Sequence, residues 1–174
     1  MSAPLVVLKF GSSVLHSIED LPEAVHEIYR HWRAGKRVVA VVSALGNTTD
    51  ELLGRARAIT REPEPEALAA LLATGERAAV EYLALALQES GLPARSLAPE
   101  RAGVRVAGST LDSEPVAIDV AALERALAAH PILVLPGFVG LDEEGRLALL
   151  GRGGSDLTAL ALAAALGAER CVLL

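Results

Sequence analysis

Cysteine and aromatic residues are scarce in this sequence of 174 residues. The one cysteine, Cys171, excludes an internal disulfide framework or a zinc site built from several thiolates, and its apolar neighbours predict a small core residue. Aromatic residues make up 3% of the chain, whereas Ala, Leu and Val dominate a hydrophobic fraction of 52%. This composition is typical of a sheet covered by helices and not of a disordered chain.

An excess of positive charge is also missing. The chain has 16 Lys and Arg against 22 Asp and Glu, a net charge of −6, and no basic stripe, which argues against a nucleic-acid partner. No apolar stretch is long enough to span a bilayer, and Lys9 and Gly11 interrupt the short apolar start. We therefore expect no membrane partner and a cytoplasmic location.

Apolar runs alternate with helical patterns along the chain. Buried strands are predicted at residues 5–10, 37–42, 132–135 and 170–174, weaker strands at 95–98 and 104–106, and a hairpin at 137–150. Helices are predicted at 21–34, 48–60, 66–73, 76–90, 119–129 and 159–166. This order indicates an α/β fold, a three-layer αβα sandwich with a mostly parallel central sheet. Because the chain ends within an apolar strand, we expect it to be part of a longer protein.

A glycine-rich turn at residues 150–158 precedes the last predicted helix. Its glycines allow a tight turn that points backbone N–H groups at one spot, where the helix dipole adds partial positive charge. Arg152 adds a cation with forked donors, so the turn predicts an anion site, most simply for phosphate. Asp156 is not needed for an anion and indicates that a metal or a second cation is also organised there.

Polar groups follow four predicted strands, at Lys9 to Ser13, Ser43 to Asp50, Pro136 to Phe138 and Arg152 to Asp156. Ligands of parallel sheets bind beyond the carboxyl ends of the strands, so we expect these groups to meet. Lys9 alone has two interpretations: a cation that reaches a phosphate, or a strand-end lysine that extends to water. Neither the Walker pattern nor the dinucleotide fingerprint is present, and the histidines have no metal-ligand spacing.

Five motifs together resemble aspartate kinases of the amino-acid kinase superfamily. They are Leu8-Lys9-Phe10-Gly11-Ser12-Ser13-Val14, Val42-Ser43-Ala44-Leu45-Gly46-Asn47-Thr48-Thr49-Asp50, Ala73-Thr74-Gly75-Glu76-Arg77, Pro136-Gly137-Phe138-Val139-Gly140 and Gly151-Arg152-Gly153-Gly154-Ser155-Asp156. They occur in that family's order and span almost the whole chain. The resemblance implies the amino-acid kinase fold, incomplete at its C-terminus, and phosphorylation of aspartate to 4-phospho-L-aspartate with ATP and Mg²⁺, in the synthesis of lysine, threonine and methionine.

The resemblance also implies roles for particular residues. Lys9 would bind the transferred phosphate, and Asp156 would orient Lys9 and the reacting groups, directly or through Mg²⁺. The nucleotide phosphates would be held by Lys9, Gly11, Ser12, Ser13, Gly153 and Gly154. Aspartate would be bound by Ser43, Thr49, Glu76, Phe138, Arg152 and Ser155, with Glu76 on its amino group and Arg152 on its α-carboxylate. Without the resemblance, Glu76 is simply an acidic residue favourable at a helix N-terminus.

The chain departs from the family at two points. Ser12 stands where a second glycine is usual, which would weaken phosphate binding if that position needs positive φ. This variant is similar to kinases fused to homoserine dehydrogenase or to a decarboxylase of the lysine pathway. Residues 1–174 would form the substrate-binding part with the phosphate cradle, without the nucleotide-base-binding part and the regulatory domains, and would assemble as a homo-oligomer. The alternatives are a kinase for a glutamate-type acceptor and a non-catalytic module that senses aspartate or aids assembly.

Overall fold

A computed structural model describes residues 3–174, and a five-stranded parallel sheet forms its centre. Its strand order is β3-β6-β2-β1-β9, and every neighbouring pair is parallel. The strands are β1 (Leu5–Phe10), β2 (Arg37–Val42), β3 (Ala94–Ser96), β6 (Ile132–Pro136) and β9 (Arg170–Leu173). The expected bounds of β1 and β2 are those observed, and Cys171 on β9 is half-buried.

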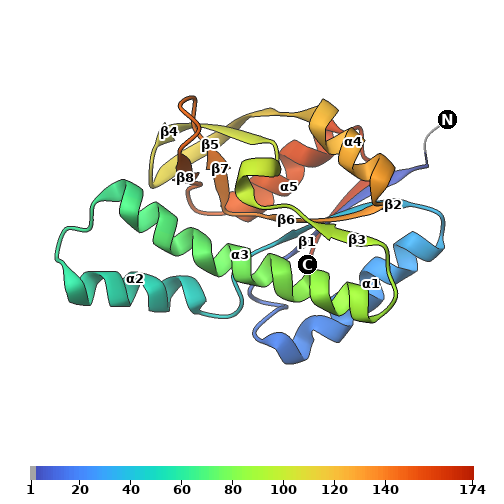
Figure 1. The fold of residues 1–174 in the computed structure, drawn as a ribbon, viewed down its shortest axis with the longest axis horizontal. Coiled ribbons are helices and arrows are strands. Elements are labelled where there is room, and N and C mark those ends of the chain that lie inside the picture. The colour runs from blue at the N-terminus through green and yellow to red at the C-terminus, as the bar shows by residue number, and fades with distance from the viewer. Residues whose placement is uncertain (1–2) are drawn as a thin grey trace.

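Helices cover both faces of this sheet, which confirms the predicted sandwich (Figure 1). One face carries α1 (Leu21–Arg33) and α3 (Pro65–Glu89), and the other carries α4 (Val120–Ala129) and α5 (Gly154–Ala165). Alternate residues of one strand serve the two layers: Val6 and Leu8 pack with α1 and α3, whereas Leu5 and Val7 pack with α4 and α5. Burial of both faces explains why these strands are continuously apolar.

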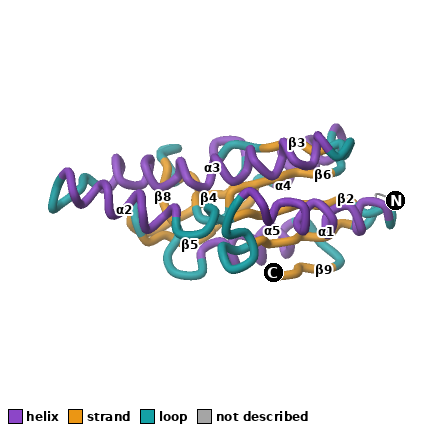
Figure 2. The backbone as a smooth tube through the Cα atoms, turned by 90° about the horizontal axis from the view of Figure 1, so that it is seen from below, coloured by secondary structure: helices purple, strands orange, loops and turns teal. Residues whose placement is uncertain are grey.

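A second, smaller sheet was predicted only in part: the weaker strand at 104–106, now within β4 (Val104–Ser109), and the hairpin were expected, but their union in a separate sheet was not. It joins β4, β5 (Asp112–Ile118), β7 (Val139–Leu141) and β8 (Leu147–Leu149) in the order β5-β4-β7-β8. The hairpin of β7 and β8 was predicted, but β5 was not, because it contains Pro115 and most of its side chains are exposed. The sheet packs against the hairpin formed by α2 (Thr48–Ile59) and α3, which projects beyond the strands in Figure 2.

The prediction of two helices separated by Thr74-Gly75 is wrong, because α3 runs unbroken through both residues. Gly75 is there for close packing and not as a helix break. A Cβ at this position would lie 3.1 Å from Thr48 Cγ2 and 3.2 Å from Ala44 Cβ, so its absence lets the loop after β2 approach α3. Glu76 consequently lies in the middle of a helix and not at its beginning.

Two of the three expected N-terminal caps of helices are present in the structure, and one is not. Asp119 accepts a hydrogen bond from the Ala122 N–H and caps α4 as expected, and the box of Ser17 and Asp20 precedes α1 in a short 3-10 helix, η1 (Ile18–Asp20). Thr48, in contrast, does not cap α2: it is the first helical residue, after Asn47. A second 3-10 helix, η2 (Pro99–Arg101), leads into β4.

Candidate active site

A cavity of about 330 Å³ lies beyond the carboxyl ends of β1 and β2, beside the N-terminus of α5. The strand-end groups expected to meet do contribute to it. The predicted site residues that line it are Lys9, Gly11, Ser12, Ser13, Ser43, Thr49, Glu76, Phe138, Gly153, Gly154, Ser155 and Asp156. The topology therefore brings five distant segments of the chain to one place.

Lys9 and Asp156 form an ion pair in this cavity. Lys9 Nζ lies 2.9 Å from Asp156 Oδ1, and the side chains are 15% and 43% exposed. Lys9 thus points into the cavity and does not simply extend to water. Within residues 3–174, Oδ1 is covered and makes no hydrogen bond of good geometry, so its contact with the ammonium compensates its charge.

The glycine after β1 allows the ammonium to occupy this position. A Cβ on Gly11 would lie 2.6 Å from Lys9 Nζ, so any other residue would displace the lysine. Ser12 follows without strain, since no non-glycine residue of the described chain has positive φ. The position of Ser12 therefore does not require a glycine backbone.

The N-terminus of α5 forms the wall of the cavity beside Lys9. Gly153 precedes the helix with φ of 76°, in the left-handed region that favours glycine. A Cβ on Gly154 would lie 2.4 Å from Leu150 Cβ, so the turn also needs glycine to pack closely. The helix dipole places partial positive charge next to the ammonium of Lys9, which makes this wall favourable for an anion.

Hydroxyl groups connect the segments around the cavity. Ser43 Oγ donates to Ser155 Oγ at 2.9 Å, and Thr158 Oγ1 donates to the Gly137 carbonyl at 2.6 Å. A Cβ on Gly137 would lie 2.7 Å from Ser155 Cβ, so glycine lets the end of β6 pack against α5. These contacts hold the ends of β2 and β6 at fixed distances from the helix terminus.

Glu76 is a buried carboxylate, 2% exposed, beneath the cavity. Its Oε1 accepts the Ala44 N–H at 2.9 Å and its Oε2 accepts the Gly137 N–H at 3.2 Å, so one side chain joins the loops after β2 and β6. Burial raises the pKa of Glu76 to about 7, while these backbone hydrogen bonds and the nearby Lys9 oppose the rise. The carboxyl group therefore titrates close to neutral pH.

This pKa predicts how stability changes with pH. Because the folded-state pKa lies above the unfolded value of 4.5, the native state binds the proton more tightly. The free energy of unfolding should fall as pH rises from about 4.5 to about 7, by about 3 kcal/mol for this group, and then level off. Denaturant titrations of the wild type and of Glu76→Gln across pH 4–8 measure this.

The difference between the free energies of unfolding of the wild type and Glu76→Gln isolates the contribution of Glu76, because all other groups titrate in both proteins. The glutamine variant would carry no such pH dependence, although its amide nitrogen would face a backbone donor and lower stability at every pH. Parallel pH profiles of the two proteins would contradict the assignment.

Arg152 is the predicted site residue that does not line the cavity: its side chain is exposed, although Gly153 beside it contributes. Spacing along the chain placed it near the site but could not set its direction. Four lining residues were quoted in motifs and given no role, namely Ala44, Gly46, Asn47 and Asp50. The position of Asp50 in the first turn of α2 after a buried strand was the signal for it.

The chain is similar in sequence to proteins of one known family. The family model described as the amino acid kinase family matches residues 4–174. The chain belongs to the amino acid kinase family. It is 40% identical over 167 residues to aspartokinase 2 of Bacillus subtilis (strain 168), covering 96% of this chain and 41% of that protein. The chain thus spans about two fifths of the length of this curated relative.

Solved structures of aspartate kinases share the fold. The aspartate kinase from Synechocystis matches with a TM-score of 0.80 and 37% identity, over 97% of this chain and 28% of that one. E. coli aspartokinase III, in complex with aspartate and ADP, matches with a TM-score of 0.76 and 24% identity, over 97% of this chain and 48% of that one, which supports the fold alone.

The described part of this member of the amino acid kinase family contains no cluster of three or more His, Cys, Asp or Glu that could hold a metal ion. A single carboxylate, Asp156, lies at the wall suited to phosphate. This fits Mg²⁺, which usually keeps several waters and binds through one or two carboxylates together with substrate phosphates.

None of the helices within residues 3–174 combines the length and apolar character that crossing a bilayer requires.

Proposed function

We propose that this chain forms the substrate-binding part of an aspartate kinase. A side-chain carboxylate oxygen of L-aspartate bonds to the γ-phosphorus of ATP, and the bond from that phosphorus to the β–γ bridging oxygen breaks. The products are 4-phospho-L-aspartate and ADP, at the first step of lysine, threonine and methionine synthesis. The identity of 40% to a curated aspartokinase supports this substrate over other acceptors.

The pair of Lys9 and Asp156 beside the N-terminus of α5 is the observation that carries the proposal. Phosphoryl transfer needs positioning and neutralisation of charge more than a strong base. The attacking carboxylate is already ionised at neutral pH, so no general base is required. Lys9 neutralises charge on the transferred group, and Asp156 holds the ammonium in place. Gly11, Ser12, Ser13, Gly153 and Gly154 surround the phosphates.

The other side of the cavity suits a zwitterionic amino acid. Glu76 offers a carboxylate for the α-amino group, and such an ammonium beside it would lower its raised pKa. Arg152 provides a cation for the α-carboxylate once its exposed side chain turns inward. Ser43, Thr49, Phe138 and Ser155 complete the substrate contacts.

The nucleotide is bound as its Mg²⁺ complex in this proposal. Mg²⁺ would be held by Asp156 together with phosphate oxygens, and it supplies positive charge that neutralises those oxygens when bound. We also infer that the protein acts in the cytoplasm. We further infer that it forms a homo-oligomer, and light scattering after size-exclusion chromatography would measure its molar mass.

The reaction is tested by trapping its product. The complete protein, with ATP and Mg²⁺, should form a hydroxylamine-trapped acyl phosphate with L-aspartate and not with L-glutamate. Turnover of glutamate without aspartate would favour the glutamate-type kinase. Aspartate binding by calorimetry without nucleotide binding or turnover would favour a sensing module, and binding of neither would favour a structural role.

Arg152→Ala should raise the KM for aspartate by about 10- to 100-fold and change kcat much less. The charge-assisted contact to the α-carboxylate would stabilise the bound substrate and the transition state equally, so its loss weakens binding more than it slows the reaction. Steady-state kinetics at saturating ATP measure this. Arg170→Ala is the matched control, as Arg170 is an exposed arginine on β9 outside the cavity. An unchanged KM in Arg152→Ala would remove Arg152 from the substrate site.

A further inference from the structure

A second cavity, of about 680 Å³, lies between α4 and the segment from β3 to β4, and shares no residue with the candidate active site. Arginines from four different elements line it, together with one histidine. They are Arg95 on β3, Arg101 at the end of η2, Arg105 on β4, Arg125 on α4, and His130 just after α4. Such a concentration of positive charge is unexpected in a chain with a net charge of −6.

These four arginines have no carboxylate partner within residues 3–174. Seven other Lys and Arg residues do have one, namely Lys9, Arg30, Lys36, Arg37, Arg55, Arg77 and Arg146. Arg33, Arg57, Arg61, Arg152 and Arg170 also lack one, but none of them lines this cavity. Arg105 donates only to the Asp142 carbonyl, at 3.4 Å. The guanidinium groups around the cavity therefore keep their forked donors available.

The two carboxylates in the lining are already engaged elsewhere. Glu100 forms an ion pair with Arg77 on α3, outside the cavity, and Asp119 caps α4 by accepting the Ala122 N–H at 2.9 Å. Neither compensates the four arginines. A cleft lined mainly by one sign of charge, with low-dielectric walls, concentrates the field and attracts counter-ions.

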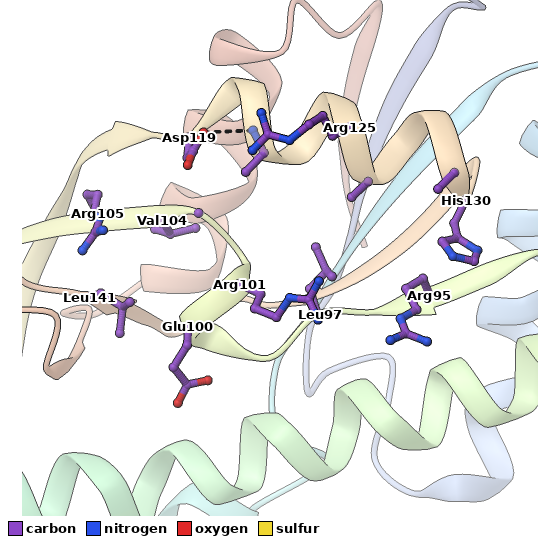
Figure 3. A pocket seen from close by; sticks show the side chains of 14 residues that line it. Arg95, Leu97, Glu100, Arg101, Val104, Arg105, Asp119, Arg125, His130 and Leu141 are labelled. Atoms are coloured by element: carbon purple, nitrogen blue, oxygen red, sulfur yellow. Dashed lines mark hydrogen bonds between the residues drawn. The ribbon is translucent and has the colours of Figure 1, made fainter.

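The arrangement of the side chains suits a ligand that lies along the cavity. Figure 3 shows Arg95 and His130 at one side, Arg105 at the other and Arg101 between them, with Arg125 above on α4. The floor includes Leu97 and Val104, which are buried apolar residues. Apolar walls combined with convergent polar groups are typical of small-molecule sites.

We propose that this cavity binds a small, multiply charged phosphate compound at a site separate from the active site. Arginine is the side chain best matched to phosphate, because its planar fork donates two parallel hydrogen bonds. The cationic groups lie on different elements around a volume large enough for two or more phosphate groups, so the ligand bridges α4 and the β3–β4 segment.

Pyrophosphate is the probe, titrated by calorimetry into the complete protein carrying Lys9→Ala, which weakens the active-site phosphate position. We expect saturable binding that Arg101→Ala/Arg125→Ala weakens at least about tenfold, since charged hydrogen bonds are lost. Arg57→Ala/Arg61→Ala removes the same charge from exposed, unpaired arginines outside the cavity and should change the Kd less than about twofold.

All four arginines of the cavity are exposed, so folding should survive, as circular dichroism would check. Arg125→Ala alone gives the same readout if the double variant does not fold. Absence of saturable binding, or equal weakening in the cavity variant and the control, would overturn the proposal. Binding of an acidic peptide but not of pyrophosphate would overturn it as well, in favour of a protein partner.

Discussion

Lys9→Met should lower kcat by about 10³-fold or more in the complete protein, because the transferred group would lose the cation that neutralises its charge. The neutral side chain has a similar length and can occupy the same path over Gly11. The Asp156 side chain is 43% exposed as a whole but its Oδ1 is covered, so the substitution should also lower stability, without leaving a fully buried carboxylate. Coupled measurement of ADP release gives kcat, and circular dichroism gives the fold.

Lys36→Met is the matched control for this substitution. Lys36 is paired with Glu169 at a distance of 2.9 Å, away from the cavity, and its loss should leave kcat within about twofold. Normal turnover by a folded Lys9→Met protein would contradict the phosphate role of Lys9.

Asp156→Asn should lower kcat by about 10²- to 10³-fold, because the ammonium of Lys9 would lose its charged partner and its fixed position. The side chain keeps its shape, so the N-terminus of α5 should remain intact. Glu143→Gln, which removes the charge of an exposed carboxylate outside the cavity, is the control and should retain activity. Steady-state kinetics of both variants measure the difference.

The effects of Lys9→Met and Asp156→Asn on kcat should not be additive. Because Lys9 and Asp156 act as one unit, the double variant should be little slower than Lys9→Met alone. A double variant that loses the full product of the two single effects would mean that the residues act independently, which the 2.9 Å pair does not support.

The central sheet was predictable because strands that are buried on both faces are apolar at nearly every position. The run 37–42 is apolar at almost every position, and its ends coincide with β2. The pairing of Lys9 with Asp156 was expected for an incomplete reason. Lys9 lies on β1 of the parallel sheet, but Asp156 follows β8 of the second sheet and reaches Lys9 because α5 packs on the face of β1. The strands themselves needed only local pattern.

Features that depend on contacts between distant segments were not predictable. Thr74-Gly75 resembles a break, and only the approach of Ala44 and Thr48 explains a glycine inside α3. Nothing local revealed that Glu76 would be buried and would join two loops through the Ala44 and Gly137 amides. The direction of the Arg152 side chain is likewise set by its surroundings and not by its place in the motif.

The position of the nucleotide's terminal phosphate tests the account most directly. A crystal structure of the complete protein with L-aspartate and a non-hydrolysable ATP analogue should place the γ-phosphate within hydrogen-bond distance of Lys9 Nζ and beside the N-terminus of α5. The aspartate side-chain carboxylate should then face that phosphorus. A γ-phosphate bound away from Lys9, with aspartate outside the cavity, would contradict the account.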